Sequence, residues 1–285
     1  MSALITAKDL GKRYGNFAAL DHVNFSIEPG RIVGLIGPNG AGKTTALRAI
    51  LGLTSFSGEL TVFGKDPFAS RSAIMQDTCF IADVAVLPGW LKVGQALDFA
   101  GGVHPRFRRE RATGLLSKTQ IKLDSRIREL SKGMKTQVHL ALAMAIDAKL
   151  LVLDEPTLGL DLLARRAFYD ALVNDYMDDA RTILITTHQV EEVENLLTDV
   201  MFIDKGHIVL DTPVEDIAAH FVAISVHPDK IGAAQAAGPF YTRPLMGKTI
   251  MYYDRAPSPE LAALGEPHTP TVADLFVAKL SPGAA

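Results

Sequence analysis

One segment of nine residues has the spacing of a phosphate-binding loop, G-x-x-x-x-G-K-[ST]. It runs Gly37-Pro38-Asn39-Gly40-Ala41-Gly42-Lys43-Thr44-Thr45, between a predicted strand and a predicted helix. Glycines let backbone N–H groups surround phosphate oxygens, and the helix N-terminus adds positive potential. We expect Lys43 to reach the β- and γ-phosphates of a nucleotide and the Thr44 hydroxyl to ligate Mg²⁺. The alternative, an ordinary glycine-rich turn, does not explain the Lys-Thr pair in register.

Two acidic residues, Asp154 and Glu155, directly follow the apolar run Leu150-Leu151-Val152-Leu153. A buried strand of this kind would deliver both carboxylates to its end, beside the phosphate-binding loop. We expect Asp154 to hold Mg²⁺, directly or through water, and Glu155 to polarise the attacking water as general base. Alone, the segment fits a solvated acidic turn equally well. Together with the loop, it predicts a P-loop nucleoside triphosphatase that uses Mg²⁺.

Further motifs, in their order and spacing, resemble those of ABC ATPases over roughly residues 3–211. The segments that carry the resemblance are Tyr14 at the place of the aromatic A-loop, Leu130-Ser131-Lys132-Gly133-Met134 for the signature L-S-G-G-Q, Asp154-Glu155-Pro156-Thr157 for the acidic motif, Gly159-Leu160-Asp161 for the D-loop and Thr186-Thr187-His188 for the H-loop. Each motif is short, and it is their combination that is specific.

The resemblance implies ATP as the ligand and a role for each motif. Tyr14 would stack on adenine, and His188 would contact the γ-phosphate and position the catalytic water. Ser131 and the backbone N–H of Gly133 would bind the γ-phosphate of ATP held by a second ATPase subunit, in a homodimer or a heterodimer. The plainer alternatives are a strand-end tyrosine for Tyr14 and a structural histidine for His188.

Two places depart from the family pattern. Lys132 and Met134 stand where the signature usually has Gly and Gln, and Lys132 would add a positive charge near the phosphates. Asp83 falls where the Q-loop glutamine is expected. An aspartate can ligate Mg²⁺ or orient water, but it cannot donate a hydrogen bond when ionised; an exposed loop Asp without a role is the alternative. Trp90 is either an anchor for a membrane subunit or a cap of the helical subdomain.

Alternating strands and helices position these residues and predict an α/β fold with a largely parallel sheet. The resemblance implies a P-loop NTPase of ABC ATPase type, with a mixed sheet, an antiparallel β subdomain and a helical subdomain at about 84–146. We expect the ATPase domain to span 1–212 and a small α+β C-terminal appendage to span 213–285. The expected strands are 4–7, 22–27, 31–36, 58–63, 78–82, 150–153, 182–186, two around 205–206, 222–226 and 249–253; the expected helices are 43–51, several in 93–145, 162–177, 190–197, one near 231 and 272–280.

Composition limits the remaining possibilities. Of the 285 residues, 48% are hydrophobic, enough for a full core, and the formal net charge of −3 argues against a nucleic-acid partner. The single cysteine, Cys79, excludes an intrachain disulfide and is expected to be a core residue. No run reaches the roughly 20 apolar residues of a membrane helix. We therefore expect a cytoplasmic chain that reaches the inner face of the cell membrane through partner subunits.

These observations favour the ATP-binding and ATP-hydrolysing subunit of an ABC transporter that acts on separate integral membrane subunits. The stretch 269–278 is similar to the ending of ATPases from bacterial ABC-2-type exporters, so export is expected rather than import. The alternative is a non-transport ABC ATPase acting on nucleic acid or ribosomes. Such proteins usually carry two ATPase units or long coiled-coil insertions, and neither is recognisable in this sequence.

Overall fold

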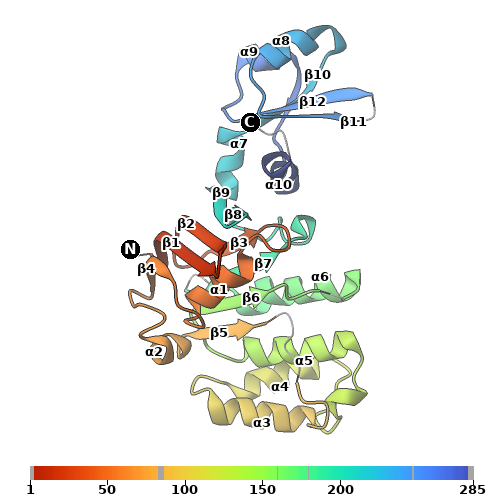
Figure 1. Ribbon diagram of the computed structural model, residues 1–285. Helices are drawn as coiled ribbons and strands as arrows, with labels where there is room; N and C mark the ends of the chain where they lie inside the picture. Colours follow the sequence, from red (N-terminus) through yellow and green to blue (C-terminus); the bar gives the residue numbers. More distant parts are fainter. Residues whose placement is uncertain (1–2, 83–86, 159, 179, 246, 282–285) are drawn as a thin grey trace.

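A six-stranded sheet forms the centre of the computed structural model, which describes residues 3–82, 87–158, 160–178, 180–245 and 247–281 (Figure 1). Its strand order is β5-β6-β7-β3-β8-β9, and only β9 is antiparallel to its neighbour. The bounds are β3 Ile32–Ile36, β5 Thr78–Ile81, β6 Leu150–Asp154, β7 Thr182–Thr187, β8 Asp199–Asp204 and β9 His207–Pro213. Strands β3, β6 and β7 are buried throughout, which explains their continuous apolar runs.

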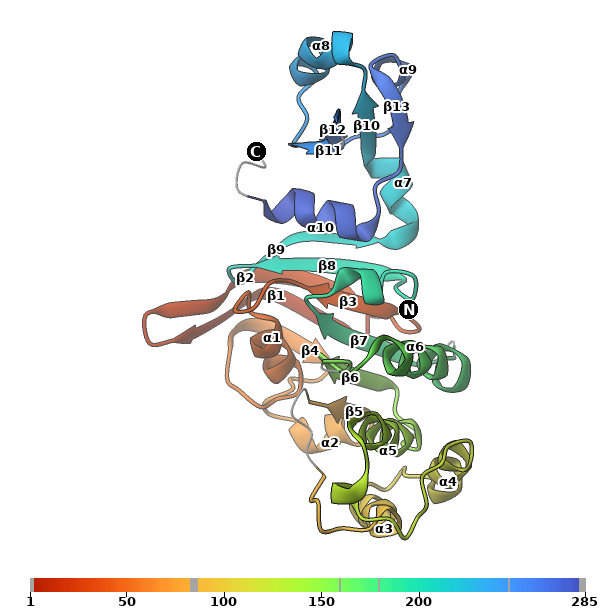
Figure 2. The same ribbon diagram turned by 90° about the vertical axis from the view of Figure 1, so that its right-hand side faces the viewer.

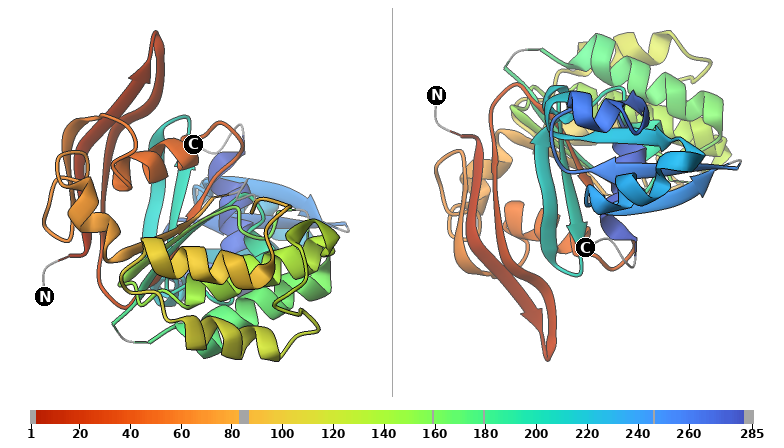
Figure 3. Two further views of the ribbon diagram at one scale, coloured as in Figure 1. Left: turned by 90° about the horizontal axis from the view of Figure 1, so that it is seen from below. Right: turned by 90° about the horizontal axis from the view of Figure 1, so that it is seen from above.

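An antiparallel three-stranded sheet, in the order β2-β1-β4, covers helix α1 on the side away from the central sheet. Its strands are β1 Ile5–Tyr14, β2 Phe17–Ile27 and β4 Ser57–Val62, and α1 spans Lys43–Ile50. The ribbon of β1 and β2 extends well beyond the rest of the sheet (Figure 3). Both strands are longer than the sequence predicts, because polar residues at the far end of the ribbon interrupt the apolar alternation.

Three helices with their own hydrophobic core lie at the opposite end of the central sheet from the C-terminal sheet (Figure 1). They are α3 Val93–Val103, α4 Arg109–Ser117 and α5 Lys132–Met144, with a 3₁₀ turn, η1 Ile127–Glu129, before α5. A short helix, α2 Arg71–Met75, precedes β5. The structure therefore has helices where the sequence predicts a helical subdomain, and Cys79 is buried in the core as expected.

The C-terminal residues form a four-stranded antiparallel sheet in the order β11-β12-β10-β13. Helices α8 and α9 pack on one face, and α10 lies between the other face and strands β8 and β9 (Figure 2). The bounds are α7 Ile217–His220, β10 Val222–Val226, α8 Ile231–Ala236, β11 Tyr241–Leu245, β12 Lys248–Tyr253, α9 Pro259–Ala262, β13 Gly265–His268 and α10 Val272–Leu280, with 3₁₀ turns η4 Val214–Asp216 and η5 Pro228–Lys230.

Two helix predictions need correction. The segment 190–197 is a 3₁₀ turn, η3 Val190–Glu192, followed by turns, although the buried residues Val190, Val193 and Leu197 have helical spacing. Only residues 188–198 connect β7 to β8, and the chain bends there so that Thr198 can pair with Ile32. Helix α6 covers Leu162–Ala171 and then continues as a π-helical turn, η2 Leu172–Tyr176.

Candidate nucleotide-binding site

The phosphate-binding loop joins the end of β3 to the start of α1, and its glycines are required by geometry. Gly40 and Gly42 have φ of +83° and +117°, in the left-handed region that favours glycine. A Cβ on Gly37 would lie 2.3 Å from the carbonyl oxygen of Ile203. The Gly37 N–H donates to the Thr187 carbonyl at 3.3 Å, which ties the loop to β7.

Lys43, the first residue of α1, is only 6% exposed, and its ammonium group lies inside this loop. Nζ donates to the carbonyls of Gly37 at 2.6 Å and Pro38 at 3.3 Å. It also lies 3.5 Å from Oε1 of Glu155. A buried ammonium ion needs such partners, and these are all acceptors that phosphate oxygens could replace.

The acidic pair lies at the end of β6, next to β7. Asp154, 6% exposed, accepts a hydrogen bond from the Thr186 hydroxyl at 2.6 Å. Glu155 follows with φ of +48°, a strained backbone for this residue type, and its N–H donates to the Thr186 carbonyl at 3.1 Å. Both carboxylate oxygens of Glu155 lie 3.0 Å from Nδ1 of His188. Because β6 and β7 are parallel neighbours, these four side chains meet at one edge of the sheet.

A cavity of about 490 Å³ brings most of the predicted residues together. Its walls include Tyr14, Pro38, Asn39, Gly40, Gly42, Lys43, Thr44, Thr45, Asp154, Glu155 and His188. Tyr14, at the end of β1, is 46% exposed, and its side chain is therefore about half-buried beside this cavity. Phe17, 60% exposed at the start of β2, lines the same cavity and is absent from the sequence predictions. The sequence feature that could have predicted this position of Phe17 is an aromatic residue three places after Tyr14, across the turn that joins β1 to β2.

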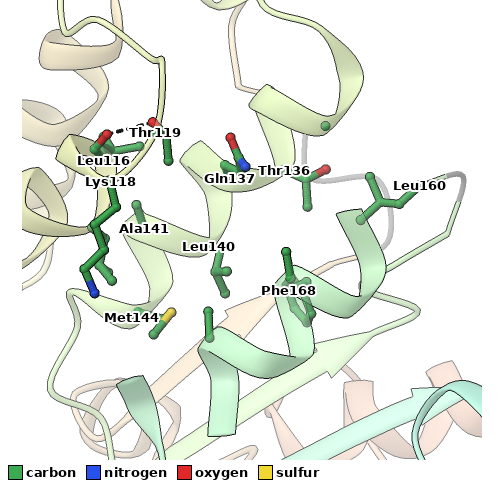
Figure 4. Close-up of a pocket in the computed structure, with 14 residues that line it drawn as sticks. Leu116, Lys118, Thr119, Thr136, Gln137, Leu140, Ala141, Met144, Leu160 and Phe168 are labelled. Atoms are coloured by element: carbon green, nitrogen blue, oxygen red, sulfur yellow. Dashed lines mark hydrogen bonds between the residues drawn. The ribbon is translucent and has the colours of Figure 1, made fainter. Parts of the chain in front are cut away.

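The signature residues lie elsewhere. Ser131 caps the N-terminus of α5, where its Oγ accepts from the Met134 N–H at 3.2 Å. Gly133 lines a separate, mainly apolar cavity of about 180 Å³ between α4, α5 and α6. Leu160 and Phe168 line the same cavity (Figure 4). Neither residue lines the cavity around Lys43. Asp83 lies outside the described residues.

The donor set at the site fits Mg²⁺ only with help from a ligand. No group of three or more His, Cys, Asp or Glu side chains that could hold a metal occurs among the described residues. Thr44 and Asp154 line the same cavity and offer oxygen atoms. Mg²⁺ is commonly bound by one or two such groups together with phosphate oxygens and water. The site therefore fits a metal that arrives with a nucleotide.

Trp90, which the sequence leaves open between two roles, is 69% exposed. It lies in the turn before α3. Across the part of the chain that the structure describes, no helix is both long and apolar enough to cross a membrane.

Comparisons with known proteins identify the family to which this fold belongs. Residues 20–158 match the family model "ABC transporter". The chain is 32% identical to Nod factor export ATP-binding protein I of Cupriavidus metallidurans, over 93% of this chain and 90% of that protein. It is 38% identical to the probable multidrug ABC transporter ATP-binding protein YbhF of Escherichia coli, over 67% of this chain and 34% of that one.

Among solved structures, one described as the structure of an ATP-binding subunit of an ABC transporter superposes with a TM-score of 0.67 and 29% identity. The match covers 75% of this chain and 91% of that chain. These findings confirm the predicted fold class, a P-loop ATPase of ABC type. The chain belongs to the family of ABC transporter ATP-binding proteins, whose domains hydrolyse ATP in transporters.

Proposed function

We propose that this chain powers export through separate integral membrane subunits by an ATP-dependent closure of two ATPase subunits. The single observation that carries the proposal is the convergence of Lys43, Asp154, Glu155 and His188 on one cavity. The names of two relatives, which refer to Nod factor export and to a probable multidrug transporter, support the export direction.

The chemistry follows from the positions of these groups. ATP phosphates would take the place of the loop carbonyls around Lys43, and Thr44 and Asp154 would hold Mg²⁺, which screens phosphate charge. Glu155 would accept a proton from the attacking water, since its carboxylate faces the cavity. His188, 3.0 Å from that carboxylate, would orient the water and contact the γ-phosphate. Tyr14 and Phe17 form an aromatic rim on which adenine would stack.

A second ATPase subunit would complete the site. Ser131 and Gly133, expected to bind the γ-phosphate, do not line the cavity of their own chain. Leucine side chains are exposed beside the D-loop: Leu158, Leu162 and Leu163 are 48%, 76% and 81% exposed. Apolar groups of this size gain stability when they are covered. A homodimer or heterodimer, with ATP between the subunits, would cover them and supply the missing phosphate contacts.

The proposed location is the inner face of the cell membrane, reached through the membrane subunits. The rival function, an ABC ATPase acting on nucleic acid or ribosomes, is disfavoured by the net charge of −3. Sedimentation of this chain with membranes that contain the partner subunit would support the transporter role. Co-purification with nucleic acid would support the rival function.

The catalytic assignment is tested with Glu155→Gln, compared with Glu191→Gln, the same change at an exposed residue. We expect turnover of Mg-ATP to fall by about 100-fold or more in the first variant, while ATP converts monomer to dimer in size exclusion. Normal turnover would show that Glu155 is not the base. An inactive variant that stays monomeric with ATP would mean that another subunit completes the site.

A further inference from the structure

The side chain of Arg165, in the first turn of α6, contacts both loops that follow the catalytic strands. Its Nε donates to the carbonyl of Leu160 at 2.8 Å, in the segment that follows Glu155. Its Nη1 donates to Oε1 of Gln189 at 3.0 Å, beside His188. The same Nη1 forms an ion pair with Glu192 of η3. The guanidinium group therefore joins the D-loop to the H-loop.

Glu192 makes a second connection between the same two loops. Its Oε2 accepts a hydrogen bond from the Thr157 hydroxyl at 3.1 Å, and Thr157 is buried against Tyr169, with the two side-chain oxygens 3.2 Å apart. The loop after β6 is thus attached at two points, Thr157 and Leu160, to the loop after β7.

The residue types suit this position. A guanidinium group has five N–H donors in a rigid plane, so it can hold acceptors from both loops in a fixed geometry; an ammonium group has three donors on a flexible stem and fixes the directions of its partners less. Arg165 and Glu192 are both mostly buried, with side chains 24% and 16% exposed. Each leaves an uncompensated charge if the other is removed.

The backbone of Glu155 is strained, and the contacts of Arg165 and Glu192 with the loop that follows it would help to hold that strained conformation. A non-glycine residue with φ of +48° is strained, and the surrounding structure has to stabilise that conformation. Thr186 holds the amide of Glu155. After Glu155, the next side-chain attachments of the loop are those of Thr157 and Leu160 to Glu192 and Arg165.

The carbonyl that Arg165 binds also belongs to a residue facing the signature helix. Leu160 and Gly133 line the same cavity between α5 and α6 (Figure 4). The D-loop turn and the helix that carries the signature residues therefore face each other across this cavity.

We infer that Arg165 and Glu192 are a pair of positioning residues that set the geometry of Glu155 and His188 for hydrolysis. The inference rests on the proposed function, in which those two residues act on the attacking water. Neither member of the pair lines the phosphate-binding cavity. Their loss lowers kcat and leaves the KM for ATP nearly unchanged.

The experiment is a double-mutant cycle on the full chain, with Arg165→Ala, Glu192→Ala and both together, measured as kcat and KM for ATP. We expect each single change to lower kcat by about 10- to 100-fold, the size of effect that a misplacement of about 1 Å produces. The double variant should lose little more than either single variant, because the two residues act as a unit. Arg166→Ala, which removes the same charge from the neighbouring exposed position, should stay within about twofold of wild type.

Two conservative variants separate positioning from folding. Arg165→Lys and Glu192→Gln keep much of the packing but not the full set of bonds, and they should lower kcat while urea unfolding shows a folded protein. Wild-type kcat in these two variants and in Arg165→Ala overturns the inference, as does a KM effect without a kcat effect. Failure of the proposed function is distinct, because Glu155→Gln would then retain turnover whatever Arg165 does.

Discussion

Thr186 provides a sharp test of how the acidic residues are held. Its side chain is fully buried on β7 and donates to Oδ1 of Asp154 at 2.6 Å, while its oxygen accepts from the Glu155 N–H at 3.3 Å. Thr186→Val has nearly the same shape but offers neither bond. A hydrogen bond to a charged group contributes about 1.5–3 kcal/mol. We expect the free energy of unfolding to fall by about that amount.

Thr182→Val is the matched control. Thr182 lies on the same strand and is equally buried, but its oxygen accepts from a neutral donor, the N–H of Gly30, at 3.0 Å. Loss of a neutral hydrogen bond costs about 1 kcal/mol. Both variants are therefore less stable than wild type, and only the first disturbs the carboxylate proposed to hold Mg²⁺.

The deciding measurement is ATP turnover as a function of Mg²⁺ concentration, with stability followed by urea unfolding and circular dichroism. Removing a partner that orients a metal-binding group typically costs about 10- to 100-fold in metal affinity or activity. We expect the half-maximal Mg²⁺ concentration to rise by such a factor in Thr186→Val and to stay unchanged in Thr182→Val. Equal Mg²⁺ dependence in the two variants would refute the reasoning that Thr186 orients a metal-holding Asp154.

Three further predictions concern the rest of the molecule. Leu275→Ala, at a fully buried position of α10 against the central sheet, should lower the free energy of unfolding by about 2–5 kcal/mol, whereas Val277→Ala on an exposed position of the same helix should change it little; equal effects would mean that α10 does not contribute its buried face to the core. Burial raises the pKa of the Cys79 thiol to about 12, so a thiol reagent at pH 8 should modify the native protein far more slowly than the protein in urea, and equal rates would contradict the packing around β5. Burial lowers the pKa of His139 below its ordinary 6.5; the unfolded chain then binds the proton at higher pH than the folded one, so stability should fall as the pH drops below 6.5, and His139→Leu should weaken that dependence between pH 7.5 and 5.5 in unfolding experiments.

Much of the candidate site could be predicted from the sequence because its parts are contiguous. The residues from Gly37 to Thr45 bring their own geometry, since glycines and a helix start are all that the loop needs. The run Leu150–Asp154 identifies itself as a buried strand by composition. Local patterns of this kind predicted most strands and helices, including Val272–Leu280 with correct bounds.

Local sequence patterns did not predict the secondary structure of exposed edge strands or of a short connection between strands. Strands β11 and β13 lie at the edges of their sheet and contain Pro244 and Pro267 with charged neighbours, so no apolar alternation marks them. The helix expected at 190–197 has the right spacing of apolar residues, but the short path between β7 and β8 imposes turns.

Only the tertiary structure decided which distant residues meet. Strand order is not chain order: β7 lies between β6 and β3, and this alone places Thr186 against Asp154. The pair of Arg165 and Glu192 joins positions 27 residues apart, and Phe17 reaches the cavity because the β1–β2 ribbon extends to it. The sequence determines the chemistry that the loop and the acidic strand can perform. The packing of the sheet determines which side chains orient that chemistry, because such contacts arise only after the strands have paired.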